Sequence, residues 1–398
     1  MDTVFFIAIT IIKEALVVGV MLGLVAYSVV AERRFCAWIQ DRLGPNRVGL
    51  PLGGMTIGNI KIPEVRMAGL CQPIADGLKF IFKEEITPGH VNKFYFFLAP
   101  VLVLVPSFIT VSVVPFGSII DLRAIGEWLG LSPDVVKNLT TPAIIANIDM
   151  GILFVFAIVS LSVYGIVLAG WSSNSKYPFL GGIRSSAQMI SYEIAMGLAV
   201  VPVFLLIGKL NLQEVVAYQA QNGWLAAIFM APWGAITWQH ALLWIPMVIS
   251  FSIFLVAAFA ETNRLPFDLA ECETELVAGY HTEYGAFKFA LFFLGEYAAM
   301  IVTSCLMVTL FFGGWTLPFH EWLYTSAGTA GVPWWMGIAH ILVFLGKMAF
   351  FIFFFIWVRW TLPRFRYDQL MGLGWKFFIP VGLANILLTA GLIAYLRP

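Results

Sequence analysis

The chain has 398 residues, of which 60% are hydrophobic and only 12% are charged, and its formal net charge is zero. Soluble domains carry about 25% charged residues, so a soluble chain of this length would lack the charge to cover its surface. Zero net charge argues against a nucleic-acid partner, and the four cysteines form no CxxC pair, which argues against iron–sulfur, structural zinc and disulfide frameworks.

Eight apolar stretches are long enough to cross a hydrocarbon core, which takes about 20 helical residues. They lie at 4–30, 95–115, 149–170, 186–207, 240–260, 286–312, 335–358 and 376–396. The sequence therefore predicts an all-α membrane protein: a single integral membrane domain over residues 1–398, with about eight transmembrane helices and amphipathic interfacial helices in its loops.

Basic residues fall mainly on one side of this topology. With eight spans, the loops 31–94, 171–185, 261–285 and 359–375 share a side and hold most of the Lys and Arg residues. The other side holds Arg123, Lys137, Lys209 and Arg397. A ninth span within the uncharged stretch 215–260 would reverse the later loops and nearly erase this difference. The positive-inside rule therefore favours eight spans, with both termini on the outer side.

The first inner loop contains a helix of its own. From Met67 to Phe82 apolar residues recur at helical spacing, while Gln72, Asp76 and Lys79 share another face. We expect an amphipathic helix at about 65–84. Such a helix either lies in the membrane interface or packs on a soluble partner.

Ionisable residues occur inside the predicted spans, where a charge costs about 2.5–3.5 kcal/mol on insertion scales. Lys13 and Glu14 are adjacent and would pair poorly, because neighbouring helical residues point to different faces. Lys347 is either a structural cation paired with a glutamate or a part of proton transfer. For Glu193 and Glu296 we favour proton handling over structural hydrogen bonding, because buried carboxyl groups exchange protons near neutral pH.

The acidic inner loop 261–285 is the densest functional signal. It holds one arginine, Arg264, and six carboxylates: Glu261, Asp268, Glu271, Glu273, Glu275 and Glu283. If the stretch after Pro266 is helical, three of these acids share a face, where like charges repel unless some are protonated or paired. A solvated loop is the usual reading of such a run, but apolar residues are interleaved with the acids. We therefore expect coupled carboxylates at the entrance of a proton relay.

Five segments of the chain also resemble one protein family. They are AERRFCAWIQDRLGPNRVG (31–49), QPIADGLKFIFKEEITP (72–88), SSAQMISYEIAMGL (185–198), AETNRLPFDLAECETELVAGYHTEY (260–284) and RWTLPRFRYDQLMGLGWKFFIP (359–380). In this order, and over nearly the whole chain, they are similar to the H-type membrane subunit of bacterial respiratory complex I, the counterpart of the first mitochondrial NADH dehydrogenase subunit. Cys272 and His281 depart from the residues common in that family.

This resemblance implies a subunit of a proton-translocating NADH:quinone oxidoreductase, with no redox centre and no metal in this chain and with quinone bound as substrate beside other subunits. The chain would form the quinone access chamber and the start of the proton path. The proton path would use Glu193, Glu261, Asp268, Glu271, Glu273, Glu275 and Glu283, with Glu296 added from the residue-level argument above. The quinone chamber and its entrance would use Glu32, Arg33, Arg34, Asp76, Lys79, Lys83, Arg359 and Arg366.

The expected partners are the other membrane-arm and peripheral-arm subunits, quinone and the lipid bilayer, with no nucleic acid. The expected location is the plasma membrane of a bacterium, with the inner membrane of an organelle as the second choice. One alternative is the matching subunit of a membrane-bound hydrogenase or of a ferredoxin- or plastoquinone-linked complex. An autonomous proton-coupled secondary transporter is another, against which the lack of a detectable internal repeat counts. A purely structural anchor leaves the intramembrane acids unexplained.

Overall fold

The computed structural model describes residues 2–49, 56–57, 60–61, 69–121, 123, 127, 140–226, 238–269, 277–317 and 334–396. Within these ranges, eight helical segments are long and apolar enough to cross a membrane. They are Thr10–Ile39, Lys93–Val111, Gly151–Ser172, Lys176–Ile207, Leu242–Glu261, Ala286–Phe311, Trp335–Thr361 and Tyr367–Leu396. The predicted class, an all-α membrane protein with about eight spans, is confirmed.

Helices form nearly all of the regular structure that is described. In chain order they are α1 (Asp2–Ile39), α2 (Gln72–Phe82), α3 (Lys93–Val111), α6 (Gly151–Val159), α7 (Leu161–Ser172), α8 (Lys176–Ile207), α9 (Leu212–Asn222), α10 (Trp238–Glu261), α12 (Ala286–Phe311), α14 (Trp334–Thr361), α15 (Tyr367–Gly372) and α16 (Ile379–Leu396). Two short antiparallel hairpins lie in the loops, β1 (Thr56–Ile57) with β2 (Ile60–Lys61) and β3 (Ile119–Asp121) with β4 (Thr140–Pro142).

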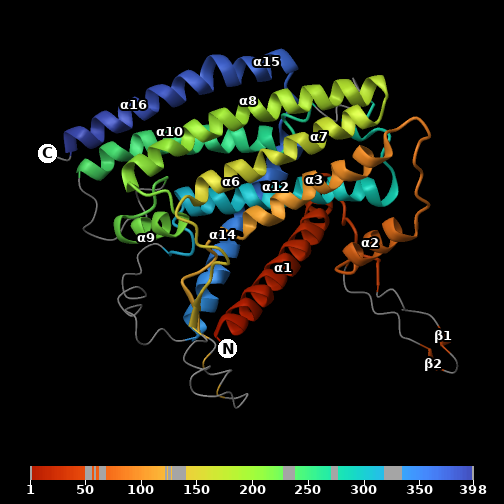
Figure 1. Cartoon of the computed structure of the whole chain (residues 1–398), viewed down its shortest axis with the longest axis horizontal. Helices are drawn as coiled ribbons and strands as arrows, with labels where there is room; N and C mark the ends of the chain where they lie inside the picture. The colour runs from red at the N-terminus through yellow and green to blue at the C-terminus, as the bar shows by residue number, and fades with distance from the viewer. Residues whose placement is uncertain are drawn as a thin grey trace.

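The long helices form a tilted bundle (Figure 1). Helices α16, α8 and α10 run side by side along one edge of the bundle, and α3, α7 and α12 pack at its centre. Helices α1 and α14 run obliquely to the other long helices, on the side of the bundle where the N-terminus lies. Helix α2 lies near one end of α1. This arrangement surrounds α12 with other helices, so most of its side chains are buried.

Small residues let the central helices approach closely. A Cβ atom on Gly165 of α7 would lie 2.6 Å from a methyl group of Val103 on α3, and one on Gly295 of α12 would lie 2.9 Å from the same side chain. Without a hydrophobic drive between helices in lipid, such close packing is a main source of helix association. Helix α3 is therefore held between α7 and α12.

Two helices begin earlier than the apolar runs indicate. Helix α8 starts at Lys176, ahead of the expected span 186–207, and the last span starts at Tyr367 and passes through a π-helical segment, Leu373–Phe378. Within the described part of the expected amphipathic helix at 65–84, the structure has α2, Gln72–Phe82, and residues 65–68 lie outside the described residues. Its apolar side chains, among them Ile81 and Phe82, are exposed on the isolated chain.

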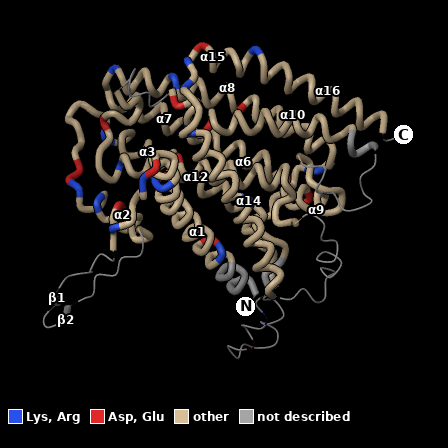
Figure 2. The backbone as a smooth tube through the Cα atoms, turned by 180° about the vertical axis from the view of Figure 1, so that it is seen from behind, with Lys and Arg blue, Asp and Glu red and all other residues tan. Residues whose placement is uncertain are grey.

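Charged residues gather at particular ends of the bundle. Figure 2 shows Lys, Arg, Asp and Glu near the ends of α2, α7, α8 and α15, whereas the middles of α8, α10 and α16 carry few charges. Charges that do lie between the helices therefore stand out, and they converge where α10 ends.

Candidate functional site

A sharp turn follows α10 and returns the chain to the bundle. The helix ends at Glu261, and Asn263 adopts a left-handed conformation with φ of 50°. The amide of Arg264 donates to the carbonyl of Phe259 over 3.2 Å, and the amide of Phe267 donates to the carbonyl of Arg264 over 2.8 Å. Asn accepts this backbone region more readily than most residues. The turn points the Arg264 side chain inward between the helices.

The Arg264 guanidinium bridges two carboxylates from different helices. Its Nη1 lies 3.0 Å from Glu32 Oε2 in the last third of α1, and its Nε lies 2.8 Å from Glu296 Oε1 in α12. The Arg264 side chain is 0% exposed, and those of Glu32 and Glu296 are 6% and 15% exposed. Buried charges persist only when they are paired, so these three residues form one ionic unit.

Two further side chains complete this unit. Arg359, near the end of α14, lies 2.7 Å from the second oxygen of Glu32. The Tyr297 hydroxyl donates to Glu32 Oε2 over 2.5 Å, and the Arg264 guanidinium lies over the Tyr297 ring at 4.1 Å. Helices α1, α12 and α14 are thus joined at one point with the turn after α10. We call Glu32, Arg264, Glu296, Tyr297 and Arg359 the ion cluster.

The ion cluster lies between two cavities. The first, which we call the arginine cavity, has a volume of about 530 Å³. It is lined by Val29, Glu32, Arg33, Cys36, Arg42, Gly44, Pro45, Phe293, Tyr297, Arg359 and Trp360. Arginines and one carboxylate line it together with aromatic rings, so it can accept a flat, partly polar molecule.

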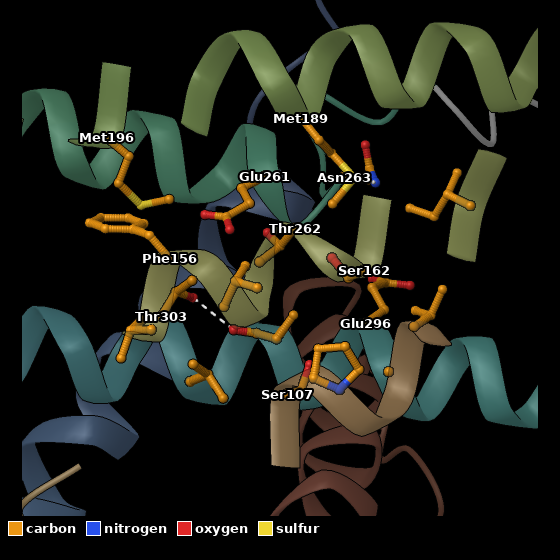
Figure 3. Close-up of a pocket in the computed structure, with 18 of the residues that line it drawn as sticks. Ser107, Phe156, Ser162, Met189, Met196, Glu261, Thr262, Asn263, Glu296 and Thr303 are labelled. Atoms are coloured by element: carbon orange, nitrogen blue, oxygen red, sulfur yellow. Dashed lines mark hydrogen bonds between the residues drawn. The ribbon is translucent and has the colours of Figure 1, made fainter. Parts of the chain in front are cut away.

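The second cavity, which we call the bundle cavity, has a volume of about 60 Å³. Figure 3 shows Glu261 from α10 and Glu296 from α12 at this cavity, with Met189 and Met196 of α8 above them. The hydroxyl groups of Ser107, Ser162 and Thr303 belong to its lining. About 10–15 Å³ of such volume holds one water, so this polar cavity has room for several. Glu261 Oε2 is buried, and no hydrogen-bond partner for it lies within the described part of the chain.

The acidic loop is less unbalanced in charge than the sequence indicates. Arg364, from the segment between α14 and α15, lies 3.2 Å from Asp268, and the Phe365 ring stacks on Phe267 at 5.3 Å. The chain is not helical from Pro266 to Leu269, so the helix considered after Pro266 does not begin there. Residues 270–276, which include Glu271, Glu273 and Glu275, lie outside the described residues.

Glu193 and Glu283 are the other expected proton-path residues whose positions the structure describes. Glu193 is half-buried in α8, near enough to Glu261 for their charges to repel. Glu283 lies between a 3-10 turn, Gly279–His281, and α12, and it is half-buried. Glu261 and Glu296 therefore line the bundle cavity, whereas Glu193 and Glu283 do not.

Some of the residues expected at the quinone chamber line the arginine cavity, and others do not. Glu32, Arg33 and Arg359 line the arginine cavity, and Asp76 of α2 pairs with Arg33 over 2.6 Å. Arg34, on α1, is close to Gly44, one of the cavity-lining residues. Lys79 and Lys83, on and just after α2, do not line the cavity, and neither does Arg366, which is 79% exposed and pairs with Asp368 over 3.2 Å.

Lys347 contacts carbonyl groups rather than a glutamate. Its Nζ donates to the carbonyl oxygens of Phe312, Gly314 and Thr316 over 2.7, 2.9 and 2.5 Å, and it lies 3.9 Å from the centre of the Trp224 ring. A lysine in this position satisfies the carbonyls just after α12 and complements the helix dipole. Lys13, which is next to Glu14 in the sequence, donates to the carbonyl of Pro142 over 3.1 Å.

Burial and charge alter the titration of three groups outside the spans. Burial lowers the pKa of the Arg264 guanidinium, but the nearby Glu296, Tyr297 and Glu32 outweigh burial and raise the pKa overall, so Arg264 stays charged. Burial lowers the pKa of His281 to about 4. Burial raises the pKa of Tyr284, opposed by a hydrogen bond to Ser172. Among the described residues, no three His, Cys, Asp or Glu side chains lie close enough together to hold a metal ion.

Sequence reasoning did not identify three residues of this region. Tyr297 carries no distinguishing signal beyond its position next to Glu296. Arg264 is the one arginine among six acids in its loop, which is a usable signal for a central counter-charge. Nε2 of Gln188 in α8 lies 2.7 Å from the carbonyl oxygen of Ala260 near the end of α10, a contact that no sequence spacing indicates.

The eight apolar helices and the ionised groups between them define an integral membrane protein that keeps charges within its bundle. Residues 12–390 match the model of the family described as NADH dehydrogenase. The H subunit of NADH-quinone oxidoreductase from Leptospira biflexa is 47% identical over 371 residues, which cover 93% of this chain and 91% of that protein. A second such subunit, from Koribacter versatilis, is 43% identical over 389 residues, 98% of both chains, and NADH-quinone oxidoreductase subunit 8 of Rhodothermus marinus is 44% identical over 94% of both. The chain belongs to the NADH dehydrogenase family, and the predicted class, a membrane subunit of NADH-quinone oxidoreductase, is confirmed.

Proposed function

We propose that this chain forms the quinone access chamber of a proton-translocating NADH:quinone oxidoreductase and the first part of its proton path. One observation carries the proposal. Arg264 bridges Glu32, which lines the arginine cavity, and Glu296, which lines the bundle cavity. A change of charge in the first cavity therefore acts on a carboxylate of the second through a single guanidinium.

The arginine cavity has the chemistry that a quinone head group needs. Arg359 and Tyr297 carry hydrogen-bond donors, and Phe293, Val29 and Trp360 supply apolar contacts to a ring. The quinone would be the substrate, bound between this chain and other subunits of the complex. Electrons would reach it from redox centres on those subunits, as the relatives' name, NADH-quinone oxidoreductase, indicates.

The ion cluster would couple the two cavities by electrostatics. Reduction of a quinone to the neutral quinol takes up two electrons and two protons. The charge beside Glu32 would change when the electrons arrive before the protons, or when neighbouring groups of the protein supply the protons. The Arg264 side chain at the centre of the ion cluster is fully buried, so a charge change beside it is screened little. Arg264 would then shift its balance between Glu32 and Glu296, and Glu296 and Glu261 would exchange protons through the bundle cavity. Glu193, which repels Glu261, would be the next carboxylate on the path.

The loops that hold the basic residues would face the inner side of the membrane, with both termini outside. A bacterial plasma membrane is the proposed location, and the relatives named above are bacterial. The other subunits of the complex would cover the exposed apolar side chains of α2 and the inner loops. The acids of the undescribed segment, Glu271, Glu273 and Glu275, are proposed to extend the proton path from this side, together with Asp268 and Glu283.

The test uses the assembled complex with Glu261→Gln and Glu193→Gln, which keep size and hydrogen bonding but remove the titration. Quinone-linked turnover and proton pumping are expected to fall together, by about ten-fold or more. NADH oxidation by an artificial acceptor is expected to stay normal, because those electrons never reach this subunit. Wild-type pumping in both variants would remove these residues from the path.

A second set of variants tests the quinone side. Charge reversal at Arg34, Lys79 or Arg366 is expected to impair assembly or to raise the apparent KM for quinone. Fully assembled complexes with wild-type quinone kinetics in all three variants would contradict their assignment to the chamber and its entrance.

A further inference from the structure

Gln188 of α8 is a fully buried amide that contacts both ends of the turn after α10. Its Nε2 lies 2.7 Å from the carbonyl oxygen of Ala260 and 2.9 Å from that of Phe267. Oδ1 of Asn263, in the middle of the turn, lies 3.2 Å from the same nitrogen. The Gln188 side chain thus joins the end of α10 to the start of the acidic loop.

The surrounding oxygens fix the orientation of this amide. An amide nitrogen donates two hydrogens, whereas an amide oxygen only accepts, and all three neighbours of Nε2 are acceptors. The reversed amide would place an oxygen against three oxygens. In the observed orientation Gln188 Oε1 is buried, with no hydrogen-bond partner among the described residues. An unsatisfied buried acceptor is unfavourable, so the contacts of the nitrogen are what keep the amide in place.

The turn that Gln188 holds forms part of the wall of the bundle cavity. Glu261 follows Ala260 directly, and both Glu261 and Asn263 line the cavity. Met189, next to Gln188, lines it as well, and its sulfur lies 3.5 Å from Asn263 Nδ2. Movement of this turn by a fraction of an ångström would therefore move a carboxylate in the cavity.

We propose that Gln188 is a positioning residue of the proton path, whose amide fixes Glu261 and Asn263 against the bundle cavity and ties them to α8, the helix that carries Glu193. This inference rests on the function proposed for the bundle cavity. The amide of Gln188 does not titrate, so it acts through Glu261 and transfers no proton itself. Groups that exchange protons need a geometry held by rigid neighbours, and Gln188 provides that support.

Asn385 of α16 offers a matched control. Its Nδ2 donates to the Pro246 carbonyl and to the Ser250 hydroxyl, both over 2.9 Å. Its Oδ1 is also buried, with no partner in the described ranges. Asn385 thus ties a neighbouring helix to α10 with the same chemistry. Ser250, however, lies about 16 Å along α10 from Glu261 at 1.5 Å per residue.

The experiment compares Gln188→Met and Asn385→Leu in the assembled complex in its membrane. The amount of complex, NADH oxidation by an artificial acceptor, the quinone-linked rate as a function of pH, and proton pumping are measured. Gln188→Met keeps the length of the side chain and removes both donors. Its quinone-linked rate is expected to fall by about ten- to a hundred-fold, since small misplacements have effects of this size, and its pH profile is expected to move. Asn385→Leu is expected to lower only the amount of complex.

The variant Gln188→Glu provides an independent test through the pH dependence of its quinone-linked rate. A purely structural role of Gln188 would not change this pH dependence. A protonated carboxyl group keeps one donor toward the three oxygens, whereas an ionised one repels them. The rate of Gln188→Glu relative to wild type is therefore expected to recover as the pH falls. The inference is overturned if Gln188→Met keeps the wild-type rate and pH profile, if Asn385→Leu moves the pH profile equally, or if Gln188→Glu shows no recovery. Intact pumping in Glu261→Gln would instead overturn the proposed function itself.

Discussion

Arg264 and Glu32 lie 232 residues apart in the chain and form an ion pair of 3.0 Å whose side chains are 0% and 6% exposed. Removing two charges from water is unfavourable, and a buried pair does not by itself indicate high stability. Here each partner has a second counter-charge, Glu296 for Arg264 and Arg359 for Glu32. Two carboxylates and two guanidinium groups therefore balance, and the loss of any one leaves a buried charge without compensation.

Glu32→Gln tests this balance. The variant keeps the shape of the side chain but leaves Arg264 and Arg359 short of one negative charge, and we expect about 3–5 kcal/mol of destabilisation. The amount of assembled complex and its rate of thermal inactivation measure the effect. Glu214→Gln is the control, because its pair with Lys209 is exposed at both side chains and contributes about 1 kcal/mol or less. Equal effects of the two substitutions would show that the ion cluster does not stabilise the fold.

The apolar runs of the sequence predicted the spans, because each hydrophobic stretch must itself be long enough to cross the membrane. They did not predict that α8 begins at Lys176. The apolar run of this span begins only after Arg184, but α8 includes Arg184 and begins eight residues before it. The Arg184 guanidinium lies 5.7 Å from the centre of the Tyr367 ring. The acidic loop was recognised from its six carboxylates, but the guanidinium that pairs with Asp268 belongs to Arg364, 96 residues later in the chain. Likewise, Glu32 of α1 pairs with Arg359 of α14. Spacing within one segment carries no information about such partners.

Substitution of Lys347 distinguishes a structural role of this lysine from a role in proton transfer. Lys347→Met removes the donor to three carbonyls after α12 and is expected to destabilise the subunit by about 1–3 kcal/mol. The amount of complex should fall, while the number of protons pumped per quinone in the complexes that assemble should stay at the wild-type value. Normal assembly with lost pumping would favour the proton-transfer alternative instead.

Gly181 of α8 allows close contact with the segment before α12. A Cβ atom there would lie 2.7 Å from the amide nitrogen of Tyr280 and 2.8 Å from the backbone of Gly279, neither of which can rotate away. Gly181→Ala is expected to displace this turn and to destabilise the subunit by about 1–3 kcal/mol. Because Tyr280 lines the bundle cavity, the quinone-linked rate should fall as well.

Gly197→Ala, in the same helix, is the control for this substitution. A Cβ atom at Gly197 meets nothing within 4 Å, so the better helix propensity of Ala is expected to stabilise α8 by about 1 kcal/mol. The melting temperature and quinone-linked rate of the purified complex are the measurements. Gly181→Ala and Gly197→Ala with the same melting temperature would show that the close approach at Gly181 is not required.

His281 makes the stability of this segment depend on pH. Its ring packs against Tyr280 and Phe289, with centroids at 5.0 and 5.2 Å, and burial lowers its pKa to about 4 from an ordinary value of 6.5. Between these values the unfolded chain binds a proton that the folded chain does not. Stability is therefore complete above pH 6.5 and falls as the pH drops toward about 4, by about 3 kcal/mol in all.

The measurement is the melting temperature of the purified complex at neutral and mildly acidic pH, for wild type, His281→Asn and His90→Asn. His281→Asn removes the titrating group, so its melting temperature should fall less on acidification than that of wild type. His90 is exposed, so His90→Asn should follow the wild-type slope. If all three proteins lose stability in parallel, the acid sensitivity belongs to groups other than His281, and the buried imidazole does not control the turn that supports Tyr280 at the bundle cavity.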